Sequence, residues 1–305
     1  MSEARFPEYL EYRTPAGEVF SFEGYAKFLM TEEGFGMPEI EYITQRGPFQ
    51  HGDSILDYRL APRILQLTYS EKSYSRHDYW DVRAGLLDIF RPNNHTLGDF
   101  GPGTLTKFLP NGQKRAIDVF PIQGPTFTIS RQGDWRETTV MDTLRFKAPD
   151  PVFYDPNQQN TLWVLATQEH LVFPITFPIR FGTLVIDDTI TVNYQGNWKD
   201  YPIITIIGPL EGAIIQNQST GEEIRLLYTI SAGETINIIL QYGRKTVTSD
   251  IAGNLIGTVV GDLATFHIAP SPEVANGNNV IRVTGGSATP ATQISICWYN
   301  RYIGI

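Results

Sequence analysis

Apolar and polar residues alternate along most of the second half of the chain, which is the pattern of half-buried β-strands. The stretch YPIITIIGP is the clearest example, because Ile204 and Ile206 fall on one side of an extended chain and their neighbours on the other. Pro202 suits the first residue of a strand, which can lack a ladder donor, and Gly208-Pro209 ends the pairing. We therefore predict an inner strand of a β-sandwich over residues 203–207.

Similar stretches follow one another through this half of the chain. Turn residues such as Ser219-Thr220-Gly221 separate them at intervals close to those of a sandwich or jelly roll. The predicted strands cover residues 162–166, 171–177, 183–192, 203–207, 212–217, 223–230, 235–241, 245–248, 279–284 and 293–299.

A helical period stands out in the segment SRHDYWDVRAGLLDIFRPNN of the first half. The series of residues at helical spacing consists of Tyr79, Val82 or Arg83, Leu86 and Phe90. We expect Asp78 to cap the start of this helix and Pro92 to end it. Strands surround it: residues 63–69 alternate, Asn111-Gly112 marks the turn of a hairpin, and RETTVMDTLRFKAPD predicts a further strand.

Charge density divides the chain into two parts. Residues 1–149 hold 17 Lys or Arg and 20 Asp or Glu, whereas residues 150–305 hold 7 and 13. Prolines in FKAPDPVFYDPNQQN enforce extended or turn conformations between the parts, so we place a hinge near Asp150. The length suits about two domains. We predict a mainly β protein, with an N-terminal domain at 1–149 that carries one helix and a C-terminal β-sandwich at 150–305.

Composition excludes several kinds of protein. Cys297 is the single cysteine, which rules out intrachain disulfides and cysteine-rich metal sites, and its alternating neighbours favour a buried structural thiol. The net charge of −9 argues against a surface that holds nucleic acid, but not against a protein that DNA slides past. We find neither a secretory leader nor roughly 18 consecutive apolar residues, so we expect synthesis in a cytoplasm and no membrane insertion.

Residue types that carry catalysis are scattered, and we predict no catalytic, cofactor-binding or metal site. The histidines lack the spacing of ligands on one element, although a site built from distant strands stays open: they are His51, His77, His95, His170 and His267. No nucleophile elbow or phosphate-binding loop occurs. Asp187-Asp188 could be half of a carboxylate dyad for sugar hydrolysis, but adjacent strand residues point to opposite faces. A two-residue hairpin turn is the favoured interpretation of that pair.

Aromatic residues in the second half leave a glycan site open. Trp198 and Trp298 are the candidate glycan contacts, because sugar-binding sandwiches use such rings as stacking platforms, although core packing is the more common role of a tryptophan. Asn94 and Asn217 match the N-glycosylation pattern. Without a secretory leader we expect both asparagines to stay unmodified.

Several motifs follow one another in a characteristic order. FKAPDPVFYDP precedes VFPITFP and then VNYQGNWKDYPIITIIGPLEGAIIQNQSTGEEIRL. In this order they resemble the distal tail protein family of long-tailed bacteriophages. The positions that match the family's strand motifs are Asn193, Gly196, Tyr201, Pro202, Ile204, Ile206 and Gly208, then Ile215, Asn217, Thr220 and Gly221. AGETINIIL and ANGNNVIRV match later elements, and LAPRILQL with the helix after it matches more loosely. The chain departs from the compact members in its length and in the drawn-out PSPEVANGNN loop.

This resemblance implies a structural virion protein that is not an enzyme and needs no cofactor. Family members form a hexameric ring at the tail tip, in which N-terminal domains join through β-contacts and C-terminal galectin-like sandwiches project outward. The implied partners are the tail tube protein, the baseplate hub protein and a fibre or receptor-binding protein, with DNA passing through the lumen. We expect acidic side chains to line that lumen.

Three alternatives remain open from the residues. The first is a carbohydrate-binding adhesin, in which the C-terminal sandwich recognises a host-surface glycan. The second is a polysaccharide-degrading enzyme, which the absence of a convincing acid pair disfavours. The third is a ring of the same fold in a related contractile particle or injection system.

Overall fold

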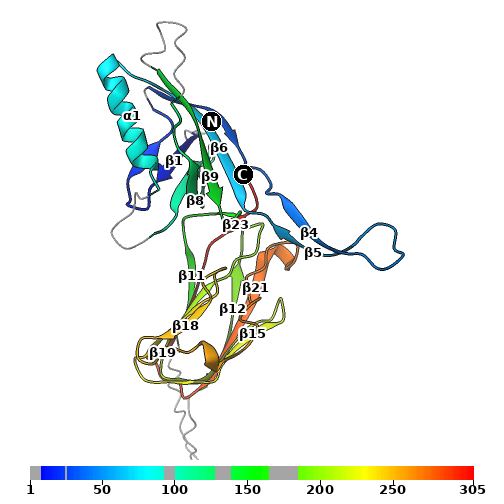
Figure 1. Ribbon diagram of the computed structural model, residues 1–305. Helices are drawn as coiled ribbons and strands as arrows, with labels where there is room; N and C mark the ends of the chain where they lie inside the picture. Colours follow the sequence, from blue (N-terminus) through cyan, green and yellow to red (C-terminus); the bar gives the residue numbers. More distant parts are fainter. Residues whose placement is uncertain (1–7, 25, 93–99, 128–138, 165–184) are drawn as a thin grey trace, which may run out of the picture. The chain divides into compact units, whose positions relative to one another are not determined.

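The computed structural model describes residues 8–24, 26–92, 100–127, 139–164 and 185–305, and it is mainly β. The chain divides into two compact units (Figure 1). Unit 1 contains residues up to 156 together with 302–305, and unit 2 contains residues 157–301. The division falls a few residues after the expected hinge, and the end of the chain returns to the N-terminal unit.

Unit 1 is built on a long antiparallel sheet in the order β2-β1-β7-β8-β9-β6-β3. Its strands are β1 (Tyr9–Arg13), β2 (Val19–Ser21), β3 (Lys27–Glu33), β6 (Arg63–Lys72), β7 (Gly103–Phe108), β8 (Lys114–Gln123) and β9 (Thr139–Ala148), extended by the short β10 (Phe153–Tyr154) and β23 (Arg301–Tyr302). The predicted strand at 63–69 and the strand that follows Arg136 are confirmed. So is the hairpin turn, where Gly112 adopts a positive φ of 80°.

Helix α1 (Arg76–Phe90) is the helix that the sequence predicts. Leu86 and Phe90 are buried in the core of unit 1, as their spacing requires. The cap is Ser75 and not Asp78, because the Ser75 side chain accepts a hydrogen bond of 3.2 Å from the Asp78 backbone N–H. Asp78 lies in the first turn, where its negative charge complements the helix dipole.

Aromatic rings fill the core of unit 1 and connect the helix to the sheet. The Phe90 ring centroid lies 5.4 Å from that of Tyr12 and 6.0 Å from that of Phe146, so strands β1 and β9 meet α1 through ring contacts. Phe20 and Phe22 pack edge to face in the same cluster, 5.1 Å apart. A core of this kind supports the sheet without any disulfide or metal among the described residues.

Strands β4 (Ile40–Gln45) and β5 (Ser54–Leu60) form a separate two-stranded sheet that the sequence pattern did not predict. Figure 1 shows this hairpin extending away from the rest of unit 1. It pairs with no other described strand. We call residues 40–60 the arm.

Unit 2 is a sandwich of two antiparallel sheets, as predicted. One sheet runs in the order β11 (Gln159–Val164), β22 (Gln293–Trp298), β13 (Ile203–Ile207), β17 (Thr235–Ile239), β18 (Thr246–Ser249) and β19 (Gly253–Asn254). The other contains β12 (Ile186–Asn193), β21 (Asn278–Gly286), β14 (Leu210–Asn217), β15 (Glu222–Leu226) and β20 (Val259–Gly261), with β16 (Thr229–Ile230) on β14. Two 3₁₀ turns, η2 (Ile256–Thr258) and η3 (Ala275–Gly277), lie in the connections.

Strand β13 is an inner strand, as the sequence indicates. It pairs with β17 on one side and β22 on the other. Ile204 and Ile206 are fully buried, whereas the alternate residues Ile203, Thr205 and Ile207 are only half-buried. The predicted strand at 171–177 lies outside the described residues.

The expected hairpin turn at Asp187-Asp188 is wrong. Both residues lie inside β12, which pairs with β21 in an unbroken register that sets Asp187 opposite Thr284 and Asp188 opposite Val283. Because β12 is the edge strand of its sheet, both carboxylates are exposed to solvent. Their charges therefore stay hydrated and destabilise the strand little. The strand expected at 223–230 is also interrupted, giving β15 and β16 in its place.

Candidate assembly surface

The two faces of the arm differ in polarity, although the more polar face also carries the exposed Ile43. Tyr42 lies opposite Tyr58, and the next pair along the same face sets Thr44 opposite Ile55. On the other face the Arg59 guanidinium lies 2.6 Å from a Glu41 carboxylate oxygen. The β-branched and aromatic residues favour strands, and the exposed ion pair keeps the opposite face soluble.

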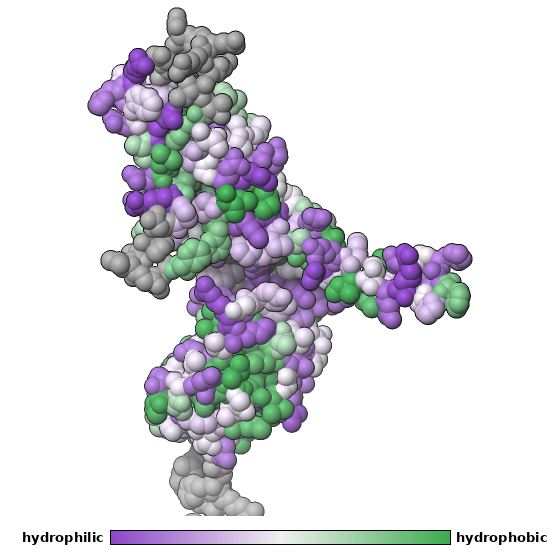
Figure 2. Space-filling model, viewed as in Figure 1, coloured by the Kyte–Doolittle hydropathy of each residue, from purple (hydrophilic) through white to green (hydrophobic). Residues whose placement is uncertain are grey.

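The apolar face of the arm is not covered by the described part of the chain. The exposed fractions are 58% for Tyr42, 52% for Tyr58 and 64% for Ile55. Figure 2 shows hydrophobic residues along the arm next to hydrophilic ones. An isolated two-stranded hairpin is marginally stable in water, and a contiguous exposed apolar patch commonly marks an interaction site. The arm is therefore a surface that gains stability when another surface covers it.

Unit 1 exposes a second apolar surface on its sheet. Phe28 of β3 and Met141 of β9 both lie opposite Ser70 of β6, so their side chains point to the same side. Phe28 is 62% exposed and Met141 51%, and Ile64 lies further along that side of β6. We call Phe28 and Met141 the Phe28 patch. Unit 1 thus carries two separate exposed apolar surfaces.

A buried arginine fixes the segment that leads into the arm. The Arg63 guanidinium donates hydrogen bonds to the backbone carbonyls of Gly34, Gly36, Pro151 and Ile303. It also lies over the Phe153 ring, 4.7 Å from the centroid. Burial lowers the pKa of Arg63 to about 10, so the group remains charged at neutral pH.

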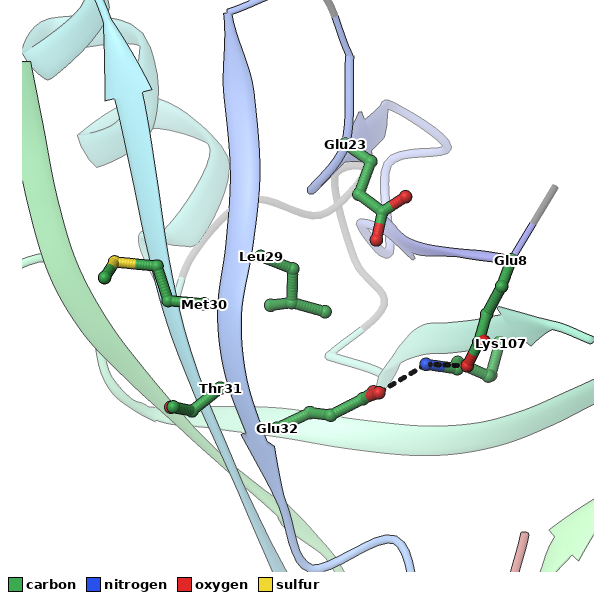
Figure 3. Close-up of a pocket in the computed structure, with 7 residues that line it drawn as sticks. All are labelled: Glu8, Glu23, Leu29, Met30, Thr31, Glu32 and Lys107. Atoms are coloured by element: carbon green, nitrogen blue, oxygen red, sulfur yellow. Dashed lines mark hydrogen bonds and ion pairs between the residues drawn. The ribbon is translucent and has the colours of Figure 1, made fainter.

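An open pocket of about 250 Å³ in unit 1 is mainly acidic (Figure 3). The Lys107 ammonium lies 2.8 Å from Glu8 and 2.5 Å from Glu32, as the dashed lines in Figure 3 mark. Burial opposes the charge of Lys107, but hydrogen bonds to the two glutamates give it a raised pKa. The pKa of Glu23 is also raised, chiefly by burial. The lysine is held as a charge-paired ammonium, so the pocket offers no basic amine for catalysis.

The two tryptophans predicted as glycan contacts have different surroundings. Trp298 is 6% exposed and belongs to the core of unit 2, so its ring has no open face on which a sugar could stack. Trp198 is half-buried, and its backbone pairs with Arg301. The two rings form no ring contact with each other among the described residues, and their sugar-binding role stays a prediction.

The other candidate residues have structural surroundings or lie outside the described residues. His267 is held by Glu273, 3.0 Å from its Nε2, and by the Thr265 carbonyl. Asn217 is fully buried and donates to the His267 carbonyl, which leaves its amide inaccessible to glycosylation. Cys297 is half-buried, less than expected, and burial raises the pKa of its thiol. His95, His170 and Asn94 lie outside the described residues.

Neither metal binding nor membrane spanning finds support among the residues that the structure describes. No group of His, Cys, Asp and Glu side chains within the described ranges could hold a metal ion. No helix in those ranges is long and apolar enough to cross a membrane.

Comparison with known proteins shows which solved structures have a similar fold. No family model matches the sequence, and no curated protein matches it. The structure is similar to the crystal structure of the SPP1 Dit (gp 19.1) protein, with a TM-score of 0.60 and 14% identity, covering 96% of this chain and 98% of that chain. It also matches the structure of the phage P2 baseplate with Ca, with a TM-score of 0.46 and 9% identity over 96% and 98% of the two chains.

The similarity to SPP1 Dit shows a shared fold over nearly the full length of both chains. That protein is described as a paradigm of the hub adsorption apparatus in phages that infect Gram-positive bacteria. The sequence resemblance to distal tail proteins therefore extends to the fold, although identity is low.

Proposed function

We propose that this chain is a structural protein of a phage tail tip that assembles into a closed ring of six copies through unit 1. The observation that carries the proposal is the fold shared with SPP1 Dit over 96% of this chain and 98% of that one. A match of that extent includes both units, so it does not rest on a common β-sandwich alone. The motif resemblance points to the same family from the residues.

The surfaces of unit 1 support ring formation. A closed ring joins two different surfaces of identical subunits, and each copy would lay the apolar face of its arm on the Phe28 patch of the next copy. Covering Tyr42, Ile55 and Tyr58 removes apolar area from water and stabilises the hairpin that carries it. The Arg63 contacts hold the approach to the arm in one conformation, which lowers the entropic cost of association.

In this proposal unit 1 connects the tail tube to the baseplate hub, and unit 2 is a peripheral module that docks a fibre or receptor-binding protein. DNA passes through the lumen of the ring, and the acidic balance of the chain favours passage without adhesion. The described residues offer no grouping that supports catalysis, so the proposed role is structural. The protein is made in the host cytoplasm and becomes part of the virion.

Labelling of the particle tests this function. Antibodies raised against the purified chain are bound to intact particles that carry its gene, and gold-labelled secondary antibodies are located by electron microscopy. We expect gold at the distal end of the tail and nowhere along the tube. Labelling of the capsid or of no part of the particle contradicts the proposal, provided that the same antibodies detect the chain in dissociated particles.

A further inference from the structure

The outer side of the β15-β14-β21 sheet in unit 2 carries a second open pocket, of about 150 Å³. Its lining residues are Ile214, Gln216, Glu223, Arg282 and Thr284. Their neighbours in sequence, Ile215, Ile224 and Val283, are buried in the sandwich core. Alternation along the strands therefore points the lining residues away from the core and toward solvent. We call this site the Gln216 pocket.

Strand register brings these residues together from distant parts of the sequence. Gln216 lies opposite Glu223 on one side and opposite Arg282 on the other. Ile214, one step along the same side of β14, lies opposite Thr284. Because three hydrogen-bonded strands supply the residues, the spacing of the polar groups is fixed by the sheet and not by a loop.

Ion pairs orient the charged groups of the pocket. The Arg282 guanidinium donates to both carboxylate oxygens of Asp187, at 2.7 and 2.8 Å, and its other N–H groups have no partner within the described residues. On the opposite side Arg225 pairs with Glu223. The hydrogen bond to Arg282 lowers the pKa of Asp187, so this pair stays ionised at neutral pH.

The charged groups at the pocket and beside it balance, so they give no net preference for an anion or a cation. The positive charges of Arg225 and Arg282 are matched by the negative charges of Glu223 and Asp187. An anion would approach two carboxylates, and a cation would approach two guanidinium groups. The pocket still holds oriented donors and acceptors, which suit a neutral ligand rich in hydroxyl groups.

The size and lining of the pocket further limit the kinds of ligand that fit. The volume is below the roughly 300 Å³ at which drug-sized sites begin, so the pocket holds one compact ring, and the rest of a longer molecule would lie outside it. The half-buried Ile214 side chain offers an apolar contact for C–H groups between the polar ones. A peptide strand cannot add here, because β14 already pairs with a neighbour on each side and its edges are occupied.

We infer that the Gln216 pocket binds a single neutral sugar ring, either free or as one residue of a glycan. Hydroxyl groups of the sugar bond Gln216, Thr284 and the Arg282 N–H groups that Asp187 does not occupy, and a C–H face contacts Ile214. The inference does not depend on ring assembly, and it places sugar binding away from Trp198 and Trp298. No aromatic ring lines the pocket, so the expected affinity for one ring is weak.

Saturation-transfer NMR with the full chain tests the inference, using a panel of neutral hexoses and N-acetylhexosamines at millimolar concentration. We expect at least one sugar to bind. The Gln216→Ala and Arg282→Lys variants should each lower the affinity for that sugar by about tenfold or more. Gln218→Ala is the matched control, because Gln218 is an exposed glutamine two residues further along and outside the pocket. Trp198→Ala is expected to bind like the unmodified chain.

Three results overturn the inference. One is that no sugar of the panel gives saturation transfer while a positive-control lectin does. Another is that the Gln216→Ala variant, shown to be folded by its thermal unfolding, binds as well as the unmodified chain. The third is that Trp198→Ala abolishes binding while Gln216→Ala does not, which would show that the sugar binds at Trp198.

Discussion

The Arg63 guanidinium donates a hydrogen bond of 2.6 Å to the backbone carbonyl of Ile303, a residue 240 positions further along the chain. The same side chain bonds carbonyls at Gly34 and Gly36, ahead of the arm, and at Pro151 after β9. One charged group thus satisfies backbone acceptors from several segments of unit 1. Its position explains why the last residues of the chain belong with the N-terminal unit.

Replacement of this arginine tests how strongly it holds unit 1 together. Arg63→Met leaves several carbonyls without their donor, so we expect unit 1 to lose about 3–5 kcal/mol of unfolding free energy. Arg59→Met is the matched control, because Arg59 forms an exposed ion pair with Glu41 that is worth at most about 1 kcal/mol. Calorimetry of both variants checks the difference, and equal transition temperatures would contradict the role assigned to Arg63.

A glycine at the end of β13 is required by close packing. A Cβ on Gly208 would lie well inside van der Waals contact with the Ser231 carbonyl oxygen and the Ile230 side chain. Gly208→Ala therefore forces a backbone shift, and we expect unit 2 to lose about 1–3 kcal/mol of stability. Gly257→Ala in the same unit meets open space and serves as control. Thermal unfolding of the two variants measures the contrast.

A buried carboxylate should make unit 2 sensitive to acid. Glu234 is fully buried and accepts hydrogen bonds from the Ser249 hydroxyl, the Ser231 N–H and the Tyr228 hydroxyl. Burial opposes its ionisation, but these hydrogen bonds outweigh burial and hold the pKa of Glu234 below its usual range. A lowered folded-state pKa contributes stability that is present above the unfolded-state pKa and is lost as pH falls through the folded-state pKa.

Glu234→Gln is expected to lower the unfolding temperature of unit 2 at neutral pH and to flatten its fall in acid. Melting curves from neutral pH to below the ordinary glutamate pKa measure this dependence. Glu211→Gln is the control, since Glu211 is exposed and bonds only Ser287 through its side chain among the described residues. Parallel pH curves for the unmodified chain and Glu234→Gln would rule out the assigned role.

The apolar face of the arm is expected to drive assembly. Changing Tyr42, Ile55 and Tyr58 together to serine removes the apolar contact, so the chain should become monomeric. Unit 2, which does not carry the arm, should keep its unfolding temperature. A double change on the opposite face, Glu41→Gln with Arg59→Gln, should leave assembly intact. Sedimentation velocity distinguishes the outcomes. Equal assembly of both variants would exclude the arm as the contact.

Local periodicity predicted the elements whose two sides differ strongly. The helix around Leu86 and the strand around Ile204 place their buried residues at the regular spacing of a helix or a strand, so spacing alone located them. The cap at Ser75 was missed because Asp78 is an equally good capping residue by type. Asp187-Asp188 was misread because exposed acids are common in turns, whereas an edge strand tolerates them as well.

The sequence did not reveal the arm or the Gln216 pocket, and the reason differs from that for the missed helix cap. The arm exposes apolar residues on one face and pairs with nothing else, so its pattern does not match a strand that covers a core. The Gln216 pocket depends on register between β15, β14 and β21, which are separated in sequence. The Arg63 contact to Ile303 depends on a chain end returning to the first unit, which no local pattern indicates.

Assembly of six copies into a closed ring underlies the whole proposed role, and the mass of the assembled protein tests it. Native mass spectrometry of the full chain at micromolar concentration is expected to show one dominant species of six copies, which images of the same sample resolve as closed rings with a central lumen. The serine variant of the arm should give the mass of one copy under the same conditions. A single-copy mass for the unmodified chain at every concentration, or an assembly that does not close, would contradict the account.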